Sequence, residues 1–225
     1  MAIYAVASHS NGISALQIQA QLGLGSYKTA WLMLQKLRRA MVDPDRSLLE
    51  DLVSVDESDI PYRTKADPIA GGQGRSAVGK LHFIGAIELS PNGHPRRIRL
   101  APLQDFSAPC IGAFVAGAVT SGATILSDGF SAYRSLKAYN HQPTVVGKMA
   151  ANIVLPWIHR VFANFNRWAL GTYHGVRAPH LRRYLEEFVF RWNRRRHMKS
   201  SFDTLIGIAA HLPHAGHRQF ADQSV

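Results

Sequence analysis

Cysteine and long apolar runs are the scarcest features of this 225-residue sequence. The single cysteine, Cys110, excludes a disulfide framework and a zinc site built from several thiolates. No apolar run approaches the roughly 20 residues that a membrane-spanning helix needs. The start, Met1-Ala2-Ile3-Tyr4, lacks a basic segment followed by an apolar one. We therefore expect no signal peptide and a cytoplasmic protein without a membrane partner.

Acidic residues are also few, with 15 Asp and Glu against 26 Lys and Arg, so the formal net charge is +11. A chain this basic is expected to bind a polyanion, and nucleic acid is the first candidate. The basic residues cluster, because residues 160–200 contain ten Lys and Arg but only two Glu. The residues that we expect to contact DNA are Lys28, Lys36, Arg38, Arg39, Arg167, Arg182, Arg183, Arg194, Arg195 and Arg196.

Residues 12–41 have the pattern of two helices separated by a glycine-containing break. Ser14 is a candidate N-cap for the first helix, and Ser26 is one for the second. A helix, a short break with glycine and a second helix are typical of a helix-turn-helix module that binds DNA. An ordinary helical hairpin has the same pattern, so both interpretations stay open.

The rest of the chain alternates between strand-like and helix-like periodicity. Strands are predicted at 50–56, 80–90, 97–103, 123–127 and 144–147, and helices at 105–119, 130–139, 155–169 and 178–196. This order predicts an α/β fold, a mixed sheet flanked by helices and preceded by the small helical module. We therefore divide the chain into a helix-turn-helix module (1–45), an α/β domain (46–200) and a C-terminal tail (201–225).

Two aspartates directly follow apolar runs at the ends of predicted strands. Asp56 lies in Val55-Asp56-Glu57, and Asp128 lies in Ser127-Asp128-Gly129. Strand ends of α/β sheets project side chains into the functional crevice, and two neighbouring carboxylates could hold Mg²⁺ or Mn²⁺. Such a centre activates a water or hydroxyl against a phosphodiester. The alternative is that each aspartate only begins a turn.

Two helices of the C-terminal half add further candidate residues. His159 and Asn166 are seven residues apart, so they share a helix face, whereas Asn164 lies on a different face. His159 is either a structural histidine or a group that binds a metal or passes a proton. Glu187 and Arg191 form an i, i+4 pair, which is either a solvated ion pair or a carboxylate that orients the arginine toward a phosphate or toward the catalytic acids.

Several short blocks occur in the order seen in one family of transposases. They are Ser26-Tyr27-Lys28-Thr29-Ala30-Trp31 with Leu37-Arg38-Arg39-Ala40-Met41, Val55-Asp56-Glu57, Gly79-Lys80, Ser127-Asp128-Gly129-Phe130 with Tyr133, Gly171-Thr172-Tyr173-His174-Gly175, and Leu181 to Arg195. Together they resemble the transposases of the IS1595 insertion-sequence family, which carry the ISXO2-like transposase domain. The likeness extends over roughly residues 10–200.

This resemblance implies an RNase H-like fold for residues 46–200 and a DDE-type mechanism with Mg²⁺ or Mn²⁺. In that mechanism, hydrolysis at the transposon ends frees a 3′-hydroxyl, which then attacks target DNA. The implied partner is double-stranded DNA, namely the terminal inverted repeats and the target. By analogy we also expect self-association on DNA and a location at the nucleoid.

Carried over by position, Asp56 and Asp128 resemble the first two metal ligands, and His159 stands at the third position. Asn164 is the alternative third residue. Asn166 stands where the family has a lysine, and Glu187 with Arg191 matches an accessory pair seen in part of the family.

The chain also departs from the family pattern. No third carboxylate is present, the lysine is replaced by Asn166, and no Cys-rich zinc ribbon precedes the helix-turn-helix. Two alternatives to an active transposase therefore stay open. One is a truncated or degenerate remnant that binds DNA without catalysis, and the other is a helix-turn-helix regulator.

Overall fold

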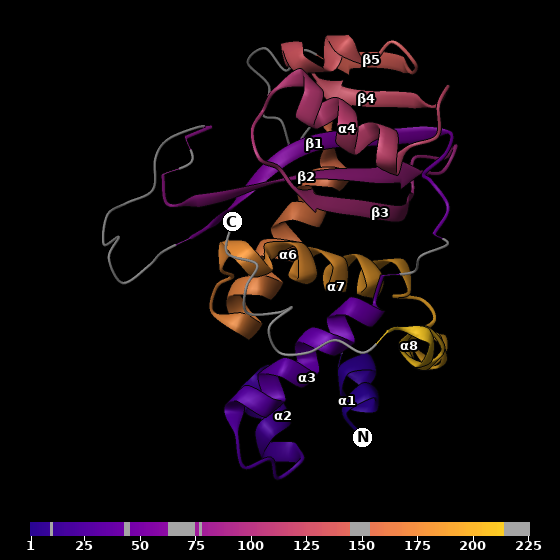
Figure 1. Ribbon diagram of the computed structural model, residues 1–225. Coiled ribbons are helices and arrows are strands. Elements are labelled where there is room, and N and C mark those ends of the chain that lie inside the picture. Colours follow the sequence, from indigo (N-terminus) through magenta and orange to yellow (C-terminus); the bar gives the residue numbers. More distant parts are fainter. Residues whose placement is uncertain (10, 43–45, 63–74, 77, 145–153, 214–225) are drawn as a thin grey trace. The chain divides into compact units, whose positions relative to one another are not determined.

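The computed structural model describes residues 1–9, 11–42, 46–62, 75–76, 78–144 and 154–213 (Figure 1). These residues fall into two compact units. The sheet unit comprises Arg46–Asn166, and the helical unit comprises Met1–Asp45 together with Arg167–Val225. The sequence-based boundaries lay at 45/46 and 200/201, whereas the units divide at 45/46 and again inside a helix, between 166 and 167.

The sheet unit contains one five-stranded sheet with the order β3-β2-β1-β4-β5. Strands β1 (Leu52–Pro61), β2 (Lys80–Leu89) and β3 (Pro95–Pro102) form an antiparallel meander. Strands β4 (Thr124–Asp128) and β5 (Asn140–Thr144) continue the sheet parallel to β1. This mixed sheet with flanking helices confirms the predicted α/β fold class.

Helices cover both faces of the sheet. On one face, α4 (Ala108–Ala118) and the 3₁₀ helix η1 (Ser131–Ser135) share a buried core with β1 and β4 (Figure 1), to which Val55, Ile111 and Tyr133 belong. On the other face, the first part of α6 (Pro156–Tyr173) packs against β2 through aromatic rings. The rings of Phe162 and Phe165 lie 5.3 and 5.1 Å from that of Phe83.

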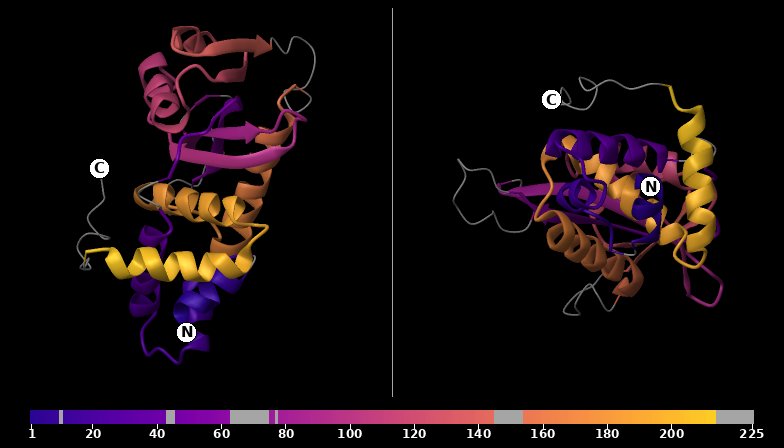
Figure 2. Two further views of the ribbon diagram at one scale, coloured as in Figure 1. Left: turned by 90° about the vertical axis from the view of Figure 1, so that its right-hand side faces the viewer. Right: turned by 90° about the horizontal axis from the view of Figure 1, so that it is seen from below.

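The helical unit has a core of its own. It contains α1 (Ala2–Ser8), α2 (Ala15–Gln21), α3 (Tyr27–Ala40), the end of α6, the 3₁₀ turn η2 (Ala178–His180), α7 (Leu181–Asn193) and α8 (Met198–His211). The predicted cap of α2 is confirmed, because Ser14 and Gln17 form a reciprocal capping box. Helix α8, the long yellow helix of Figure 2, contacts α1 and α3. Residues 198–211 are therefore a packed helix, and the prediction of a tail from residue 201 needs correction there.

Four other sequence-based boundaries differ from the structure. β1 continues to Pro61 and does not end at residue 56, because it pairs with β2 along its whole length, from Leu52↔Leu89 to Pro61↔Lys80. The helix predicted at 130–139 is the 3₁₀ helix η1. The last strand lies at Asn140–Thr144, and residues 145–147 of its predicted range lie outside the described residues. Helix α1 was not predicted.

Candidate active site

Asp56 and Asp128 come from two neighbouring parallel strands. The pairing of β1 with β4 runs from Leu52↔Thr124 to Ser54↔Leu126. Asp56 and Asp128 each lie two residues beyond this last pair, on the same face of the sheet, and the negative charge of Asp128 acts on Asp56. Asp56 lies inside the long strand β1, and Asp128 ends β4, where the Phe130 N–H donates a hydrogen bond of 3.0 Å to its Oδ1 atom. The sheet therefore positions the two predicted carboxylates next to each other.

The electrostatics of Asp56 reflect this crowding. Its side chain is 10% exposed. Burial, together with the negative charges of Glu57 and Asp128, raises the pKa of Asp56 from its ordinary value of 3.8 to about 7, although the Glu57 N–H and Arg75 act in the opposite direction. A carboxyl group whose neighbours make ionisation costly in this way is typical of a functional site.

Glu57, which sequence reasoning did not single out, is a third acidic residue at this site. It faces the α4 side of the sheet, where the buried Tyr133 hydroxyl donates a hydrogen bond of 2.6 Å to its Oε1 atom. Burial raises the pKa of Glu57 above its ordinary value, and the charge of Asp128 adds to this effect. Two sequence features point to Glu57. It directly follows Asp56, and its partner Tyr133 belongs to the motif that follows Asp128.

Arg75 forms ion pairs with two of these acids. Its Nη2 atom is 3.7 Å from Glu57 Oε2 and 3.9 Å from Asp128 Oδ2. Its guanidinium carbon also lies 3.9 Å from the centre of the Phe130 ring. Arg75 therefore offsets part of the negative charge that the three carboxylates accumulate.

Of the three candidates on α6, His159 reaches the aspartates. Its Nε2 atom lies 3.3 Å from Asp56 Oδ2. Asn166 instead donates a hydrogen bond of 3.1 Å to the backbone carbonyl of Asp59, further along β1. Asn164 is exposed. The structure thus brings His159, but not Asn166, to the carboxylate pair.

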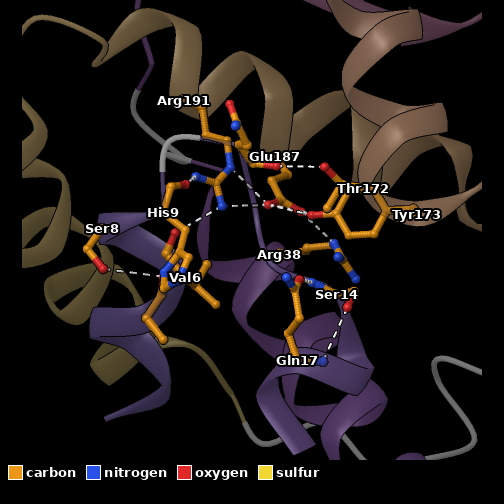
Figure 3. A network of polar contacts seen from close by, with 12 residues as sticks. Val6, Ser8, His9, Ser14, Gln17, Arg38, Thr172, Tyr173, Glu187 and Arg191 are labelled. Carbon is orange, nitrogen blue, oxygen red and sulfur yellow. Dashed lines mark hydrogen bonds and ion pairs between the residues drawn. The ribbon is translucent and has the colours of Figure 1, made fainter. Parts of the chain in front are cut away.

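Glu187 and Arg191 lie in the interior of the helical unit (Figure 3). The Glu187 side chain is 2% exposed and accepts hydrogen bonds from Arg38 Nε at 2.7 Å and Arg191 Nε at 2.9 Å. The Tyr173 hydroxyl donates to the same carboxylate at 3.1 Å. Arg191 also donates from Nη1 to the His9 carbonyl at 2.7 Å and from Nη2 to the Val6 carbonyl at 2.9 Å. The predicted i, i+4 pair exists, but it joins helices α7, α3 and α1 and is neither solvated nor directed toward a phosphate.

Most of the predicted DNA contacts lie at least partly on the surface of the helical unit. Those with exposed or half-buried side chains are Lys28, Lys36, Arg39, Arg167, Arg182, Arg183, Arg194, Arg195 and Arg196. Arg38 differs, because it is 2% exposed and paired with Glu187. Its burial corrects the sequence-based assignment, and we no longer include it among the DNA contacts. By sequence, the helical unit contains 14 basic and 6 acidic residues, a net charge of +8.

Within the described residues, no group of three or more His, Cys, Asp and Glu side chains is arranged to hold a metal ion. None of the helices in the described ranges is long and apolar enough to cross a membrane.

The fold and the carboxylate pair define an α/β protein with a mixed five-stranded sheet and two acidic residues on adjacent parallel strands. The family model of the ISXO2-like transposase domain matches residues 48–193, well over half of the chain, so the protein belongs to this family of transposases. None of the curated proteins matches the sequence. Among solved structures, a chain in the crystal structure of a pre-cleavage Mos1 transpososome is similar at 12% identity and a TM-score of 0.39. The match covers 94% of this chain and 79% of that chain, and at this TM-score it supports no further conclusion.

Proposed function

We propose that this transposase catalyses metal-dependent DNA cleavage and strand transfer of an insertion sequence, with Asp56 and Asp128 as the central catalytic residues. The observation that carries the proposal is the placement of these two carboxylates on the same face of neighbouring parallel strands. Membership in a transposase family supports the same reaction class. The DNA partners would be the terminal repeats and the target, and we propose self-association on DNA by analogy.

The donor set fits a divalent cation that prefers oxygen ligands. Mg²⁺ is commonly held by one or two carboxylates together with water and substrate phosphates, so a third acidic ligand is not required. Burial raises the pKa of Asp56, and the negative charges of Glu57 and Asp128, which add to this shift, also favour a cation there. Asp56 and Asp128 would hold Mg²⁺ or Mn²⁺, and the bound cation would supply Lewis-acid chemistry for phosphodiester cleavage and transfer.

The remaining residues have supporting roles in this proposal. His159, which faces Asp56, would fill the third position and orient that carboxylate. Arg75 would lie close to an incoming phosphate, because it borders both Glu57 and Asp128. The exposed cations of the helical unit would contact the DNA backbone and supply a salt-dependent share of the affinity.

The test is Mn²⁺-dependent nicking of plasmid DNA by the full chain and its variants. Asp56→Asn and Asp128→Asn should abolish the nicked product while duplex binding, followed by fluorescence anisotropy, persists. Asp59→Asn is the matched control, because Asp59 lies on the same strand but forms an ion pair with Lys80 at 3.3 Å. Nicking that survives in both Asp56→Asn and Asp128→Asn would refute the proposal.

The same nicking assay tests which residue of α6 contributes to the proposed DNA cleavage. His159→Ala should lower the nicking rate at least tenfold, because removing one positioned catalytic group typically costs about 10² to 10⁴ in rate. Asn164→Ala should leave the rate within about twofold, as the side chain is exposed. Equal losses of nicking rate in His159→Ala and Asn164→Ala would contradict a role for His159 in the proposed site.

A second candidate function is that of a remnant that binds DNA without cleaving it. The third position is a histidine, and the described residues contain no group of three metal-binding side chains. This alternative predicts DNA binding with a steep salt dependence and no metal-dependent product. A clean cleavage product from the purified wild-type protein would exclude it.

A further inference from the structure

The helical unit contains a cavity that the catalytic proposal does not use. It has a volume of about 500 Å³, and its lining comes from α2, α3, the end of α6, the loop before α7 and α7 itself. Binding sites for small molecules typically span about 300 to 1,000 Å³. The cavity therefore has the size of a ligand site, and all of its lining residues belong to one compact unit.

Aromatic rings form much of the lining. Tyr27 and Trp31 come from the first turns of α3, and Tyr173 and Tyr184 come from α6 and α7. Tyr27 is 50% exposed, so its ring is accessible to a guest. The Trp31 ring packs edge-on against His180, with 5.2 Å between the ring centres. Such a lining suits a flat, aromatic guest, because rings stack face to face or edge to face.

Cations lie among these rings. Lys28 and Arg177 both line the cavity, and both are exposed. The described lining contains no Asp or Glu. A guest that combines a flat ring with negative charge would therefore satisfy both components of the wall.

The deepest part of the wall is fixed by the buried network around Glu187 (Figure 3). Arg38 lines the cavity, and its guanidinium carbon lies 4.2 Å from the centre of the Tyr184 ring and 5.1 Å from that of Tyr173. Glu187 holds both Arg38 and the Tyr173 hydroxyl by hydrogen bonds. Because these side chains are already ordered, binding a guest would require little rearrangement of this wall.

We propose that this cavity binds a single nucleotide, with the base among the rings of Tyr27, Trp31 and Tyr184 and the phosphate near Lys28 and Arg177. The nucleotide could be free, or it could be an unpaired residue of a DNA strand, in which case the proposal rests on the DNA binding proposed above. Tyr27 and Lys28 begin the second helix of the predicted helix-turn-helix, whose first residues contact DNA in modules of this type. That position favours an unpaired base of DNA as the source.

The test compares three probes on the full-length protein. The probes are dAMP, a short duplex with one unpaired 2-aminopurine, and the same duplex with that base paired. Stacking on aromatic side chains contributes about 1 to 3 kcal/mol per base, so Tyr27→Ala should weaken binding of the unpaired base about tenfold. The paired duplex should change by less than about threefold. Quenching of 2-aminopurine fluorescence by the wild type should decrease in the variant.

Two further variants separate the cavity from general effects. Lys28→Gln should lower the slope of log affinity against log salt by about one, because one phosphate contact is lost. Tyr4→Ala is the matched control, since Tyr4 is 61% exposed in the same unit but does not line the cavity. Tyr27 is preferred to Trp31 as the test position, because Trp31 packs against the core of the unit and its loss could unfold it.

The outcomes distinguish this inference from the proposed function. Equal binding of both duplexes, with no specific effect of Tyr27→Ala and no binding of dAMP, would overturn the nucleotide site but leave the DNA-binding proposal intact. Binding of dAMP without binding of either duplex would support the nucleotide site but contradict the proposed function. Preference for the unpaired base, lost in Tyr27→Ala, would support both.

Discussion

Replacing Glu187 by glutamine should strongly destabilise the helical unit. The Glu187 side chain is 2% exposed, and its partner Arg38 is 3% exposed. Breaking a buried ion pair by removing one partner costs about 3 to 5 kcal/mol, because the remaining charge stays buried without compensation. Glutamine keeps the shape and one acceptor oxygen, so we expect the lower end of this range, about 3 kcal/mol. A second cation, Arg191, loses its counter-charge at the same time.

The assay is urea unfolding followed by tryptophan fluorescence. Three of the four tryptophans, Trp31, Trp168 and Trp192, belong to the helical unit, so the signal reports mainly on it. Glu186→Gln is the matched control on the same helix, where the side chain is half-buried. It should change the unfolding free energy by at most about 1 kcal/mol. Equal destabilisation by the two substitutions would refute the account of the network.

The same network predicts a pH dependence with a definite sign. Burial alone would raise the pKa of Glu187, but the charges and hydrogen bonds of Arg38 and Arg191 outweigh it and leave the pKa below its ordinary value of 4.5. A lowered carboxyl pKa stabilises the fold above the unfolded-state pKa, and this contribution is lost as the pH falls through the folded-state pKa. Acidification below about 4.5 should therefore weaken the wild type more than Glu187→Gln. A parallel acid response of the two proteins would contradict this reasoning.

Three further substitutions test the packing of the sheet unit. Tyr133→Phe removes the hydrogen bond of 2.6 Å to Glu57 and leaves a buried acceptor without its donor, so it should cost about 1 to 3 kcal/mol in thermal unfolding; a neutral effect would show that this bond does not stabilise the site. Gly85→Ala places a Cβ atom 2.6 Å from a ring carbon of Phe162 and should cost about 1 to 3 kcal/mol. The helical Gly112→Ala, which meets no atom within 4 Å, should instead stabilise by up to about 1 kcal/mol. A destabilising Gly112→Ala or a neutral Gly85→Ala would contradict this packing argument.

Local features of the fold could be predicted from the sequence because their signals lie within one turn of chain. Ser14 caps α2 through a hydrogen bond to a backbone N–H three residues later. Ser26 stands at the predicted N-cap position of α3, but its side chain makes no cap hydrogen bond there. The end of β1 could not be predicted in this way, because Asp56-Glu57-Ser58-Asp59 has the polarity of a loop. Antiparallel pairing with β2 keeps these residues in a strand, and that pairing partner starts only at Lys80.

The site shows the same division between local and distant information. Asp56 and Asp128 could be found because each ends an apolar run, and the i, i+4 rule identified the pair Glu187–Arg191. The contact between Arg38 and Glu187 joins residues 149 positions apart, and that between Glu57 and Tyr133 joins residues 76 positions apart. Neither pair has a periodic signature, so their burial and partners are visible only in the folded chain.

Mn²⁺ binding measured by electron paramagnetic resonance tests the central claim most directly. The account predicts that the wild-type protein lowers the signal of free Mn²⁺ and that this effect is lost in Asp56→Asn combined with Asp128→Asn. Asp59→Asn, on the same strand, should bind Mn²⁺ as the wild type does. Equal Mn²⁺ binding by the wild type and the double variant, or no binding by the wild type with DNA present, would contradict a metal centre at Asp56 and Asp128.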